Sequence, residues 1–362
     1  MKRTILFLLT VLVGLAAGCQ SAKVAPGTGH AASAGERPLP APTTVSPPVK
    51  IATEIYTWTT FAGEHGVSGS TDGGRNVARF NEPIGIAVDS ADHVYVADSG
   101  NHTIRKITPE GMVTTLAGSA KERGSADGTG SAARFAFPCG IDLDREDNLY
   151  VADSDNYTVR QVSPSGVVTT LAGSAGLKGG TDGVGSAARF NHLAGVALDS
   201  AGNVYVADAS NHTIRKVSPA GAVTTLAGST KKMGVADGTG EAARFSCPYG
   251  VALDPEGNVF VTDGGNGRIR LISAGGVVTT LAGSPGQFMC PYGVALDSGG
   301  NLFVTDVRGR MIRKVTPAGV VTTVGSSTVF EEPEGIAVDS AGNLYVADAW
   351  THCIFKGTPS KR

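Results

Sequence analysis

The sequence predicts an all-β fold: a six-bladed β-propeller in which an N-terminal strand completes the last blade. Three observations support this prediction. Glycine contributes 50 of the 362 residues, about twice its average share, which is typical of a chain with many tight turns. A tripeptide, Val-Ala-Asp or Val-Thr-Asp, recurs six times. The sixth copy lacks a final strand whose counterpart stands before the first copy.

The composition excludes several classes of protein. Charged residues make up only 17% of the chain and hydrophobic residues 41%, which argues against both a coiled coil and an intrinsically disordered chain. The 30 basic and 32 acidic residues nearly balance, with a net charge of −2. The sequence therefore offers no basic surface of the kind that nucleic acids require, and we expect no nucleic-acid partner.

The first 18 residues have the pattern of a secretory signal. Lys2 and Arg3 precede the apolar residues 4–14, and small residues then lead to Cys19; the apolar stretch is too short to span a bilayer. The segment resembles a bacterial lipoprotein signal, which implies removal of residues 1–18 and attachment of lipid to Cys19. The same resemblance implies a place in the bacterial cell envelope, with Gln20 favouring the outer membrane. An ordinary secretory signal that releases a soluble protein is the alternative.

Residues 19–50 are predicted to be a tether. This stretch is rich in Pro, Ala, Ser, Thr and Gly, so it cannot bury a core and behaves as an extended spacer. The propeller domain is predicted to follow as residues 51–362. The membrane contact that we expect is through the lipid alone, and the propeller itself is expected to be monomeric.

The recurring tripeptides define six units. They end at aspartates spaced by 55, 55, 55, 43 and 42 residues, and a period in this range indicates a repeat architecture rather than several domains. In the third unit, four short segments have strand character and turn signals such as Gly202-Asn203 stand between them. These segments are residues 195–199, 203–208, 213–217 and 222–228. Four antiparallel strands repeated around an axis make a propeller blade.

The two ends of the chain predict how the ring closes. The sixth unit stops after residues 353–356, without the strand Val-Thr-Thr-Leu-Ala-Gly that ends other units. Residues 59–63, Thr-Thr-Phe-Ala-Gly, match that strand and precede the first unit. We therefore expect the N-terminal strand to complete the sixth blade, so that the ring has no open seam.

The repeated motif resembles the NHL repeat, as in residues 204–217, Val-Tyr-Val-Ala-Asp-Ala-Ser-Asn-His-Thr-Ile-Arg-Lys-Val. The resemblance covers residues 56–357 and implies a six-bladed propeller used mainly as a binding platform. Some NHL-like proteins bind RNA or serve as extracellular sensors of receptor kinases, and a minority are enzymes, among them a metal-dependent peptide-amidating lyase. That lyase needs several channel histidines, whereas only His192 is placed to enter the channel here. Its activity is therefore not carried over.

Residues that recur in every unit are expected to serve the fold. The first and second strands end in aspartates, whose carboxylates can accept backbone N–H bonds in the next turn. A row of arginines on the third strands is expected to pair with carboxylates between strands or blades, and Phe355 interrupts this row. The aspartates are residues 89, 144, 199, 254, 297 and 339, and residues 98, 153, 208, 263, 306 and 348; the arginines are Arg105, Arg160, Arg215, Arg270 and Arg313.

Four units are preceded by long inserts and two by short loops. The inserts are residues 63–80, 118–135, 173–190 and 228–245, against residues 283–288 and 325–330 for the short loops. The inserts share Asp-Gly followed by Ala-Arg-Phe, which predicts a turn and about one helical turn that delivers the Phe into a packing site. Calcium binding by the Asp-Gly segment is the alternative. We expect the inserts to make the rim uneven, with a notch beside blades 5 and 6.

Residues that differ between units are the candidates for a binding face. Two positions before each innermost strand should line the mouth of the central channel, as an outer tier and an inner tier, and the turn after the second strand should reach the same face. The outer tier reads Glu82, Phe137, His192, Cys247, Cys290, Glu332; the inner tier reads Ile84, Cys139, Ala194, Tyr249, Tyr292, Glu334; the turns add His102, Tyr157, His212 and His352. The candidate ligand-binding residues among them are Glu82, His102, Tyr157, His192, His212, Cys247, Tyr249, Cys290, Tyr292, Glu332, Glu334 and His352.

One constellation within the outer tier leaves three alternatives open. His192, Cys247 and Cys290 could hold zinc with an open fourth position. A disulfide between the two cysteines is a second alternative, because exported proteins oxidise nearby thiols. Separate, half-buried thiols are the third. Cys353 is expected to be a small core residue.

Two classes of function remain. The first is a non-catalytic, lipid-anchored envelope protein whose loop-rich face binds a protein, peptide or glycan. The second is a hydrolase or lyase that uses His192, Glu332 or Glu334 as acid or base at the channel mouth. No nucleophile elbow, zinc-protease motif or P-loop is present in the propeller sequence, and the innermost strands are expected to carry no polar residue before their final Asp. We therefore expect no cofactor and favour the binding protein.

Overall fold

The computed structural model describes residues 55–360. The predicted signal 1–18, the predicted tether 19–50 and the lipid site Cys19 lie outside the described residues, as do residues 51–54 and 361–362. Within the described part, no helix has the length and apolar character needed to cross a membrane.

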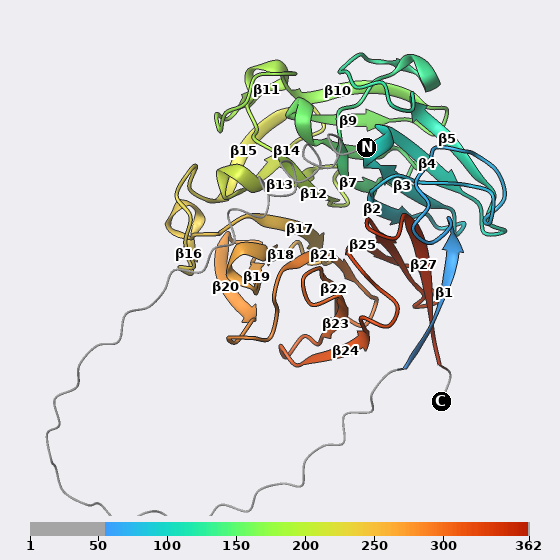
Figure 1. Cartoon of the computed structure of the whole chain (residues 1–362). Helices are drawn as coiled ribbons and strands as arrows, with labels where there is room; N and C mark the ends of the chain where they lie inside the picture. Colours follow the sequence, from blue (N-terminus) through green and yellow to red (C-terminus); the bar gives the residue numbers. More distant parts are fainter. Residues whose placement is uncertain (1–54, 361–362) are drawn as a thin grey trace, which may run out of the picture. The chain divides into compact units, whose positions relative to one another are not determined.

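The described chain forms six antiparallel sheets around a central axis (Figure 1). Blade 1 consists of β2 (Pro83–Val88), β3 (Val94–Asp98), β4 (Thr103–Ile107) and β5 (Val113–Gly118). Blade 2 consists of β7 (Pro138–Leu143), β8 (Leu149–Asp153), β9 (Thr158–Val162) and β10 (Val167–Gly173). Blade 3 consists of β12 (Leu193–Leu198), β13 (Val204–Asp208), β14 (Thr213–Val217) and β15 (Ala222–Gly228). Blade 4 consists of β17 (Pro248–Leu253), β18 (Val259–Asp263), β19 (Arg268–Ile272) and β20 (Val277–Ala282). Blade 5 consists of β21 (Pro291–Leu296), β22 (Leu302–Asp306), β23 (Met311–Val315) and β24 (Val321–Gly325). Blade 6 consists of β25 (Pro333–Val338), β26 (Leu344–Asp348), β27 (Cys353–Pro359) and β1 (Tyr56–Ala62). The predicted all-β, six-bladed propeller is confirmed.

The N-terminal strand closes the ring as predicted. Strand β1 pairs antiparallel with β27, with Tyr56 opposite Pro359, and Figure 1 shows the two side by side. Trp58 of β1 also reaches blade 5: its Nε1–H donates to the carbonyl of Val324 at 3.0 Å, and its ring packs edge-on against Phe330 with centroids 4.8 Å apart. The seam is therefore held by backbone pairing and by an aromatic contact that bridges two blades.

The core lies between neighbouring blades. The second strand of each blade is almost wholly buried, because it packs against a blade on either side. Between blades 6 and 1, for example, Tyr345 and Ala347 form one cluster with Val94 and Val96. Alternate residues of one strand thus serve two interfaces, which explains why these strands are apolar and carry few charges.

Each long insert crosses to the outer edge of the blade that follows it. Short strands in three inserts pair with the outermost strands β10, β15 and β20, and Gly73 of the first insert bridges to Val113 of β5. These strands and the 3-10 turns after them are β6 (Gly128–Thr129) and η3 (Gly130–Ala132), β11 (Gly183–Val184) and η5 (Gly185–Ala187), β16 (Gly238–Thr239) and η7 (Gly240–Ala242). Each insert ends in a fully buried Phe, as predicted: Phe80, Phe135, Phe190 and Phe245. The inserts therefore lengthen the outer edges of blades 1 to 4, and the expected notch in the rim stays a prediction.

A ring of close backbone contacts surrounds the central channel. Each innermost strand carries a glycine directly after its inner-tier residue, and this glycine lies against the inner-tier carbonyl of the next blade. A Cβ at Gly85 would lie 2.0 Å from the carbonyl oxygen of Cys139, and a Cβ at Gly335 would lie 2.0 Å from that of Ile84. No real Cβ tolerates such a contact, so glycine is required by close approach rather than by turn geometry. The same contact closes the ring between blades 6 and 1.

Candidate functional site at the channel mouth

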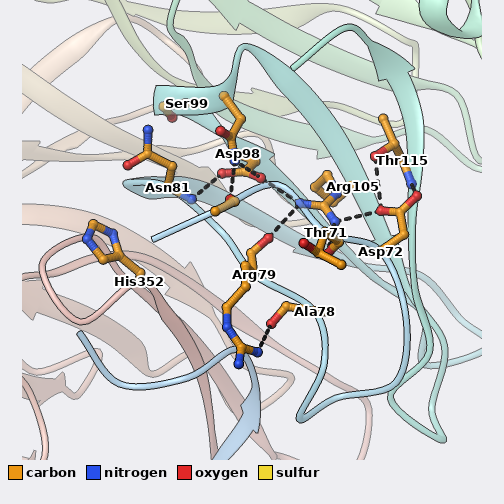
Figure 2. Close-up of polar contacts among 12 residues, drawn as sticks. Thr71, Asp72, Ala78, Arg79, Asn81, Asp98, Ser99, Arg105, Thr115 and His352 are labelled. Atoms are coloured by element: carbon orange, nitrogen blue, oxygen red, sulfur yellow. Dashed lines mark hydrogen bonds and ion pairs between the residues drawn. The ribbon is translucent and has the colours of Figure 1, made fainter. Parts of the chain in front are cut away.

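The repeated arginines and aspartates form the scaffold beneath the candidate site. In blade 1, Arg105 is fully buried and its Nη1 donates to Asp98 Oδ2 at 2.7 Å, while its Nη2 donates to Asp72 Oδ1 of the insert at 2.6 Å. Asp98 also accepts the N–H of Asn81 at 2.7 Å, which orients the segment before the first strand (Figure 2). The guanidinium lies 5.1 Å from the centre of the Phe80 ring. Arg160, Arg215 and Arg270 repeat this network, so the predicted carboxylate pairing is confirmed in blades 1 to 4.

Arg313 is the exception, and the prediction of a carboxylate partner for it is wrong. Among residues 55–360, its side-chain hydrogen bond runs from Nη1 to Thr323 Oγ1 at 2.6 Å. Blade 5 follows a short loop, so it has no insert aspartate equivalent to Asp72. Its second-strand aspartate, Asp306, instead accepts the N–H groups of Met289 and Cys290.

The insert aspartates and the first-strand aspartates have structural roles. Asp127 Oδ1 accepts hydrogen bonds from Arg160 Nη2 at 2.8 Å and from Thr170 Oγ1 at 2.9 Å, so its oxygens are used within the blade. Asp199 Oδ1 accepts the N–H groups of Ala201 and Asn203 in the adjoining turn. The expected turn-capping role of the first-strand aspartates is confirmed at this position.

The histidines of the turns after the second strands connect neighbouring blades. These turns contain η2 (Ser99–Asn101), η4 (Ser154–Asn156), η6 (Ala209–Asn211) and η8 (Gly264–Asn266). His102 adopts a left-handed conformation with φ of 61°, and its Nδ1 accepts the N–H of Phe137 in the next blade at 3.3 Å. His212 accepts in the same way from Cys247, and His352 from Glu82, both at 3.2 Å.

Because Nδ1 is an acceptor, these three histidines are neutral and protonated at Nε2. Burial lowers the pKa of all three below the ordinary value for histidine. Their place on the candidate binding face stays a prediction, but the structure shows that they also have a structural role. Their primary role is to fix the outer tier of the following blade, since the accepted N–H groups belong to outer-tier residues in the left-handed region.

On blades 2 and 3 the mouth carries a different cluster. His192 packs edge-on against Tyr157 with ring centroids 5.5 Å apart, and its Nδ1 lies 3.6 Å from Asp155 Oδ1. Asp155 is also paired with Arg123 at 2.5 Å, and both partners lower its pKa although burial opposes them. His192 is thus oriented by a carboxylate, a relation that the sequence motif alone did not reveal.

The zinc and disulfide alternatives for His192, Cys247 and Cys290 find no support. Within residues 55–360, no three His, Cys, Asp or Glu side chains are grouped as metal ligands. Both cysteines are thiols rather than halves of a disulfide. Cys353 is fully buried in a core cluster, as expected.

The inner tier brings side chains from different blades together near the axis. The rings of Tyr249 and Tyr292 stack with centroids 4.6 Å apart and an interplanar angle of 26°. The carboxylate of Glu334 on blade 6 contributes to raising the pKa of the Cys139 thiol on blade 2, after the larger effect of burial. Four of the six inner-tier residues are buried, whereas Tyr292 and Glu334 are half-buried. Solvent therefore reaches this tier at blades 5 and 6.

Glu334 has the most unusual environment of the candidate residues. Its Oε2 is buried and has no hydrogen-bond partner among the described residues. Burial, together with the charges of Glu332, Asp348 and Glu82, raises the pKa of Glu334 to about 8, and a hydrogen bond with Tyr292 opposes this rise. Glu334 is therefore mostly a neutral carboxylic acid at pH 7, poised to ionise just above it.

The outer-tier carboxylates lie in the same electrostatic environment. Burial raises the pKa of Glu82. The pKa of Glu332 is raised by burial and further by Asp348 and Glu82. These shifts mean that blades 6 and 1 concentrate like charges at one side of the mouth.

Beneath the inner tier the channel contains a cavity of about 260 Å³ lined by all six innermost strands. Most residues that line it have apolar side chains or are glycines, but the expectation that the innermost strands carry no polar residue before their final Asp is wrong. Asp142 of β7 stands where the other blades have alanine, and it was visible in the sequence. Its Oδ1 accepts the N–H of Leu143 and its Oδ2 that of Leu198 in the next blade, both at 2.9 Å. Asp142 also borders a recess of about 760 Å³ at the far end of the channel.

Two comparisons with curated proteins give partial matches. The chain is 34% identical over 228 residues to Protein SUPPRESSOR OF QUENCHING 1, chloroplastic, of Arabidopsis thaliana, which covers 59% of this chain and 21% of that protein. It is 32% identical over 168 residues to human NHL repeat-containing protein 2, covering 43% of this chain and 23% of that protein. The matches thus span about a fifth of the length of these relatives.

Solved structures share the fold at low identity. A Bacteroides thetaiotaomicron protein of unknown function matches with a TM-score of 0.64 and 20% identity, covering 85% of this chain and 76% of that one. Virginiamycin B lyase from Staphylococcus aureus matches with a TM-score of 0.55 and 12% identity, covering 84% of this chain and 99% of that one. The NHL repeat pattern itself matches residues 80–107, 190–217, 245–270 and 330–356. The chain is therefore a six-bladed β-propeller that carries NHL repeats.

Proposed function

We propose that this chain is a lipid-anchored protein of the bacterial cell envelope whose propeller binds a protein, peptide or glycan at the channel mouth. The signal-like residues 1–18, the cysteine at position 19 and the Pro-rich residues 19–50 support the anchoring. NHL-repeat relatives support a propeller that works through binding.

The contrast between scaffold and mouth carries the proposal. The Arg–Asp network is the same in four blades, and its repetition serves the fold. The outer and inner tiers differ from blade to blade and concentrate carboxylates on blades 6 and 1 and aromatic side chains on blades 4 and 5. A surface that differs around a regular ring gives a ligand one preferred orientation.

Photo-crosslinking of the full chain in envelope extracts tests the binding role. A double variant, Glu82→Gln with Glu332→Gln, alters the mouth, and Glu146→Gln with Glu256→Gln makes the same charge change at turns on the opposite face. We expect a crosslinked partner that the mouth variant loses and the control retains. A partner retained by both variants would place the binding surface elsewhere, and the absence of any partner would count against the binding role.

Lipid attachment has a separate test. Metabolic labelling with an alkyne fatty acid should label the wild-type chain and fail to label Cys19→Ser. Label that persists in Cys19→Ser, or a wild-type chain without label, would contradict the anchor while leaving the binding role intact.

A second candidate function is a hydrolase or lyase at the same mouth. The pairing of His192 with Asp155 favours it, because a carboxylate on Nδ1 orients Nε2 as a general base. Glu334, with a pKa of about 8, could supply the acid. Metal analysis of the purified chain, together with turnover assays on lactones and cyclic peptides, tests this candidate; activity lost in His192→Ala and retained in His65→Ala would support it.

A further inference from the structure

The acidic part of the mouth is built from the two blades that meet at the seam. Glu332 and Glu334 come from blade 6, and Glu82 comes from blade 1. Beneath them lies the fully buried Asp348, which accepts the N–H groups of Glu331 and Glu332 at 2.8 and 3.1 Å. The charges of Glu332, Asp348 and Glu82 raise the pKa of Glu334, and those of Asp348 and Glu82 raise the pKa of Glu332. A positive charge placed among these carboxylates would therefore relieve their repulsion.

The nearby arginine does not fill this role. Arg310 Nη1 pairs with Glu331 Oε2 at 2.6 Å, and about half of its side chain is exposed. Its charge lowers the pKa of Glu332 only as the smallest of the four contributions. The repulsion among the mouth carboxylates therefore persists in the unliganded protein.

Glu334 supplies the observation that points to a ligand. Its buried Oε2 has no donor among the described residues, and leaving such an acceptor unpaired is unfavourable. The residue as a whole is half-buried, so part of Glu334 faces the mouth although Oε2 itself is buried. A donor that enters from the mouth could satisfy this oxygen once the Glu334 side chain turns toward it.

The surroundings restrict the shape of that donor. Tyr249 and Tyr292 present a stacked aromatic pair beside Glu334, and an apolar stem can pack against them while a cation gains from their faces. On the same face, the Trp350 side chain is 68% exposed; its neighbour Ala349 donates its N–H to the carbonyl of Glu332 at 3.0 Å. A lysine side chain has this shape, since four methylenes carry a compact ammonium with three donors.

We propose that the channel mouth recognises a lysine side chain of a protein or peptide partner, whose ammonium donates to Glu334 Oε2 between the carboxylates of Glu82 and Glu332 and the Tyr249–Tyr292 pair. This inference rests on the proposed binding function and names the chemistry of its ligand. Trp350 is placed to contact the segment of the partner that flanks the lysine.

The proposal has a definite dependence on pH. The lysine ammonium remains charged below its ordinary pKa of about 10.4, whereas Glu334 ionises near pH 8. Binding therefore favours ionised Glu334, releases a proton below pH 8 and strengthens as the pH rises from 7 to 9. The titratable groups that face Glu334 are Cys139 and Tyr292, which burial keeps protonated, and the carboxyl groups of Glu82, Glu332 and Asp348.

A small probe tests the recognition of the cation directly. We would titrate the full chain with n-butylammonium, which mimics the lysine stem and head, and with n-butanol as the neutral control, by NMR at pH 7 and pH 9. We expect butylammonium to bind more tightly than butanol and more tightly at pH 9 than at pH 7. In Glu334→Gln the preference for the cation should fall about tenfold or more, the usual effect of losing a charged hydrogen bond, while Glu256→Gln on the opposite face should behave as wild type. Equal binding of the two probes, or a preference unchanged in Glu334→Gln, would overturn the proposal.

A peptide library connects this site to the proposed function. Random hexapeptides selected on the wild-type chain should be enriched in lysine, and those selected on Glu334→Gln should lose that enrichment. Enrichment without lysine, or lysine enrichment that persists in Glu334→Gln, refutes lysine recognition. If the crosslinked partner depends on Glu82 and Glu332 but not on Glu334, the binding function stands and this inference fails.

Discussion

The buried arginine of blade 2 offers the most direct test of what stabilises the ring. Arg160 donates through Nη1 to Asp153 at 2.8 Å and to the carbonyl of Arg134 at 3.0 Å, and through Nη2 to Asp127 at 2.8 Å. Replacement by methionine keeps the stem packed but leaves Asp153 as a buried carboxylate whose remaining donors are the amide of Asn156 and one backbone N–H. Breaking a buried pair in this way costs about 3–5 kcal/mol.

Arg313 provides a matched control within the same molecule. It holds the equivalent place in blade 5, but within the described residues its side-chain hydrogen bond goes to Thr323. Loss of a single such bond costs about 0.5–1.5 kcal/mol. We therefore expect Arg160→Met to lose roughly 3 kcal/mol more unfolding free energy than Arg313→Met.

Urea unfolding, followed by tryptophan fluorescence and by circular dichroism, measures this difference. Thermal midpoints should fall in the same order, by about 2 °C or more for each kcal/mol. A similar loss in the two variants, or a loss below about 1 kcal/mol for Arg160→Met, would refute the view that the Arg–Asp–insert network is a main source of stability.

Three further predictions concern the seam and the buried groups. His352→Gln should remove part of the acid sensitivity of the propeller. Burial lowers the pKa of His352, so its contribution to the stability of the fold is present above the ordinary histidine pKa of about 6.5 and is lost as the pH falls below that value. Thermal unfolding at pH 7.5 and pH 5 can measure this difference. Trp58→Ala should destabilise the ring by about 3 kcal/mol, because the Val324 hydrogen bond and the Phe330 contact are lost. An unchanged urea midpoint would contradict the view that Trp58 stabilises the boundary between blades 5 and 6. Cys353, whose pKa burial raises to about 11, and Cys139, which is also buried, should react with a thiol reagent only after unfolding. Rapid labelling of both thiols in the native chain would show that the blades open.

Repetition decided which features could be predicted from the sequence. The strands, the number of blades and the partners of Arg105 follow from residues that recur at fixed spacing, and such a pattern reports what every blade must do. Arg313 is the same residue type at the equivalent position, yet its partner differs because the counterpart of Asp72 belongs to an insert that blade 5 lacks. Residues 283–288 contain no Asp, so the sequence already indicates that Arg313 lacks the insert partner.

Other features depend on contacts between blades and leave weaker traces. The Nδ1 atoms of His102, His212 and His352 accept N–H groups from the next blade, and this depends on a left-handed backbone that residue type alone does not specify. The pairing of His192 with Asp155 joins neighbouring blades in the same way. The unpaired oxygen of Glu334 follows from the convergence of six strands on one axis. Asp142, in contrast, stands out in the sequence because the other five blades have alanine at this position.

The glycine contacts around the channel are the same at all six blade boundaries, including the boundary where the two ends of the described chain meet. Gly335 meets Ile84 across the seam in the same way as Gly85 meets Cys139 across a covalent junction, so the seam has the geometry of every other boundary. Tyr56 and Pro359 are paired neighbours, close enough for a short linker to join the two ends of the described propeller. Circular permutation could therefore move the chain ends to another blade boundary without changing the contacts that define the channel.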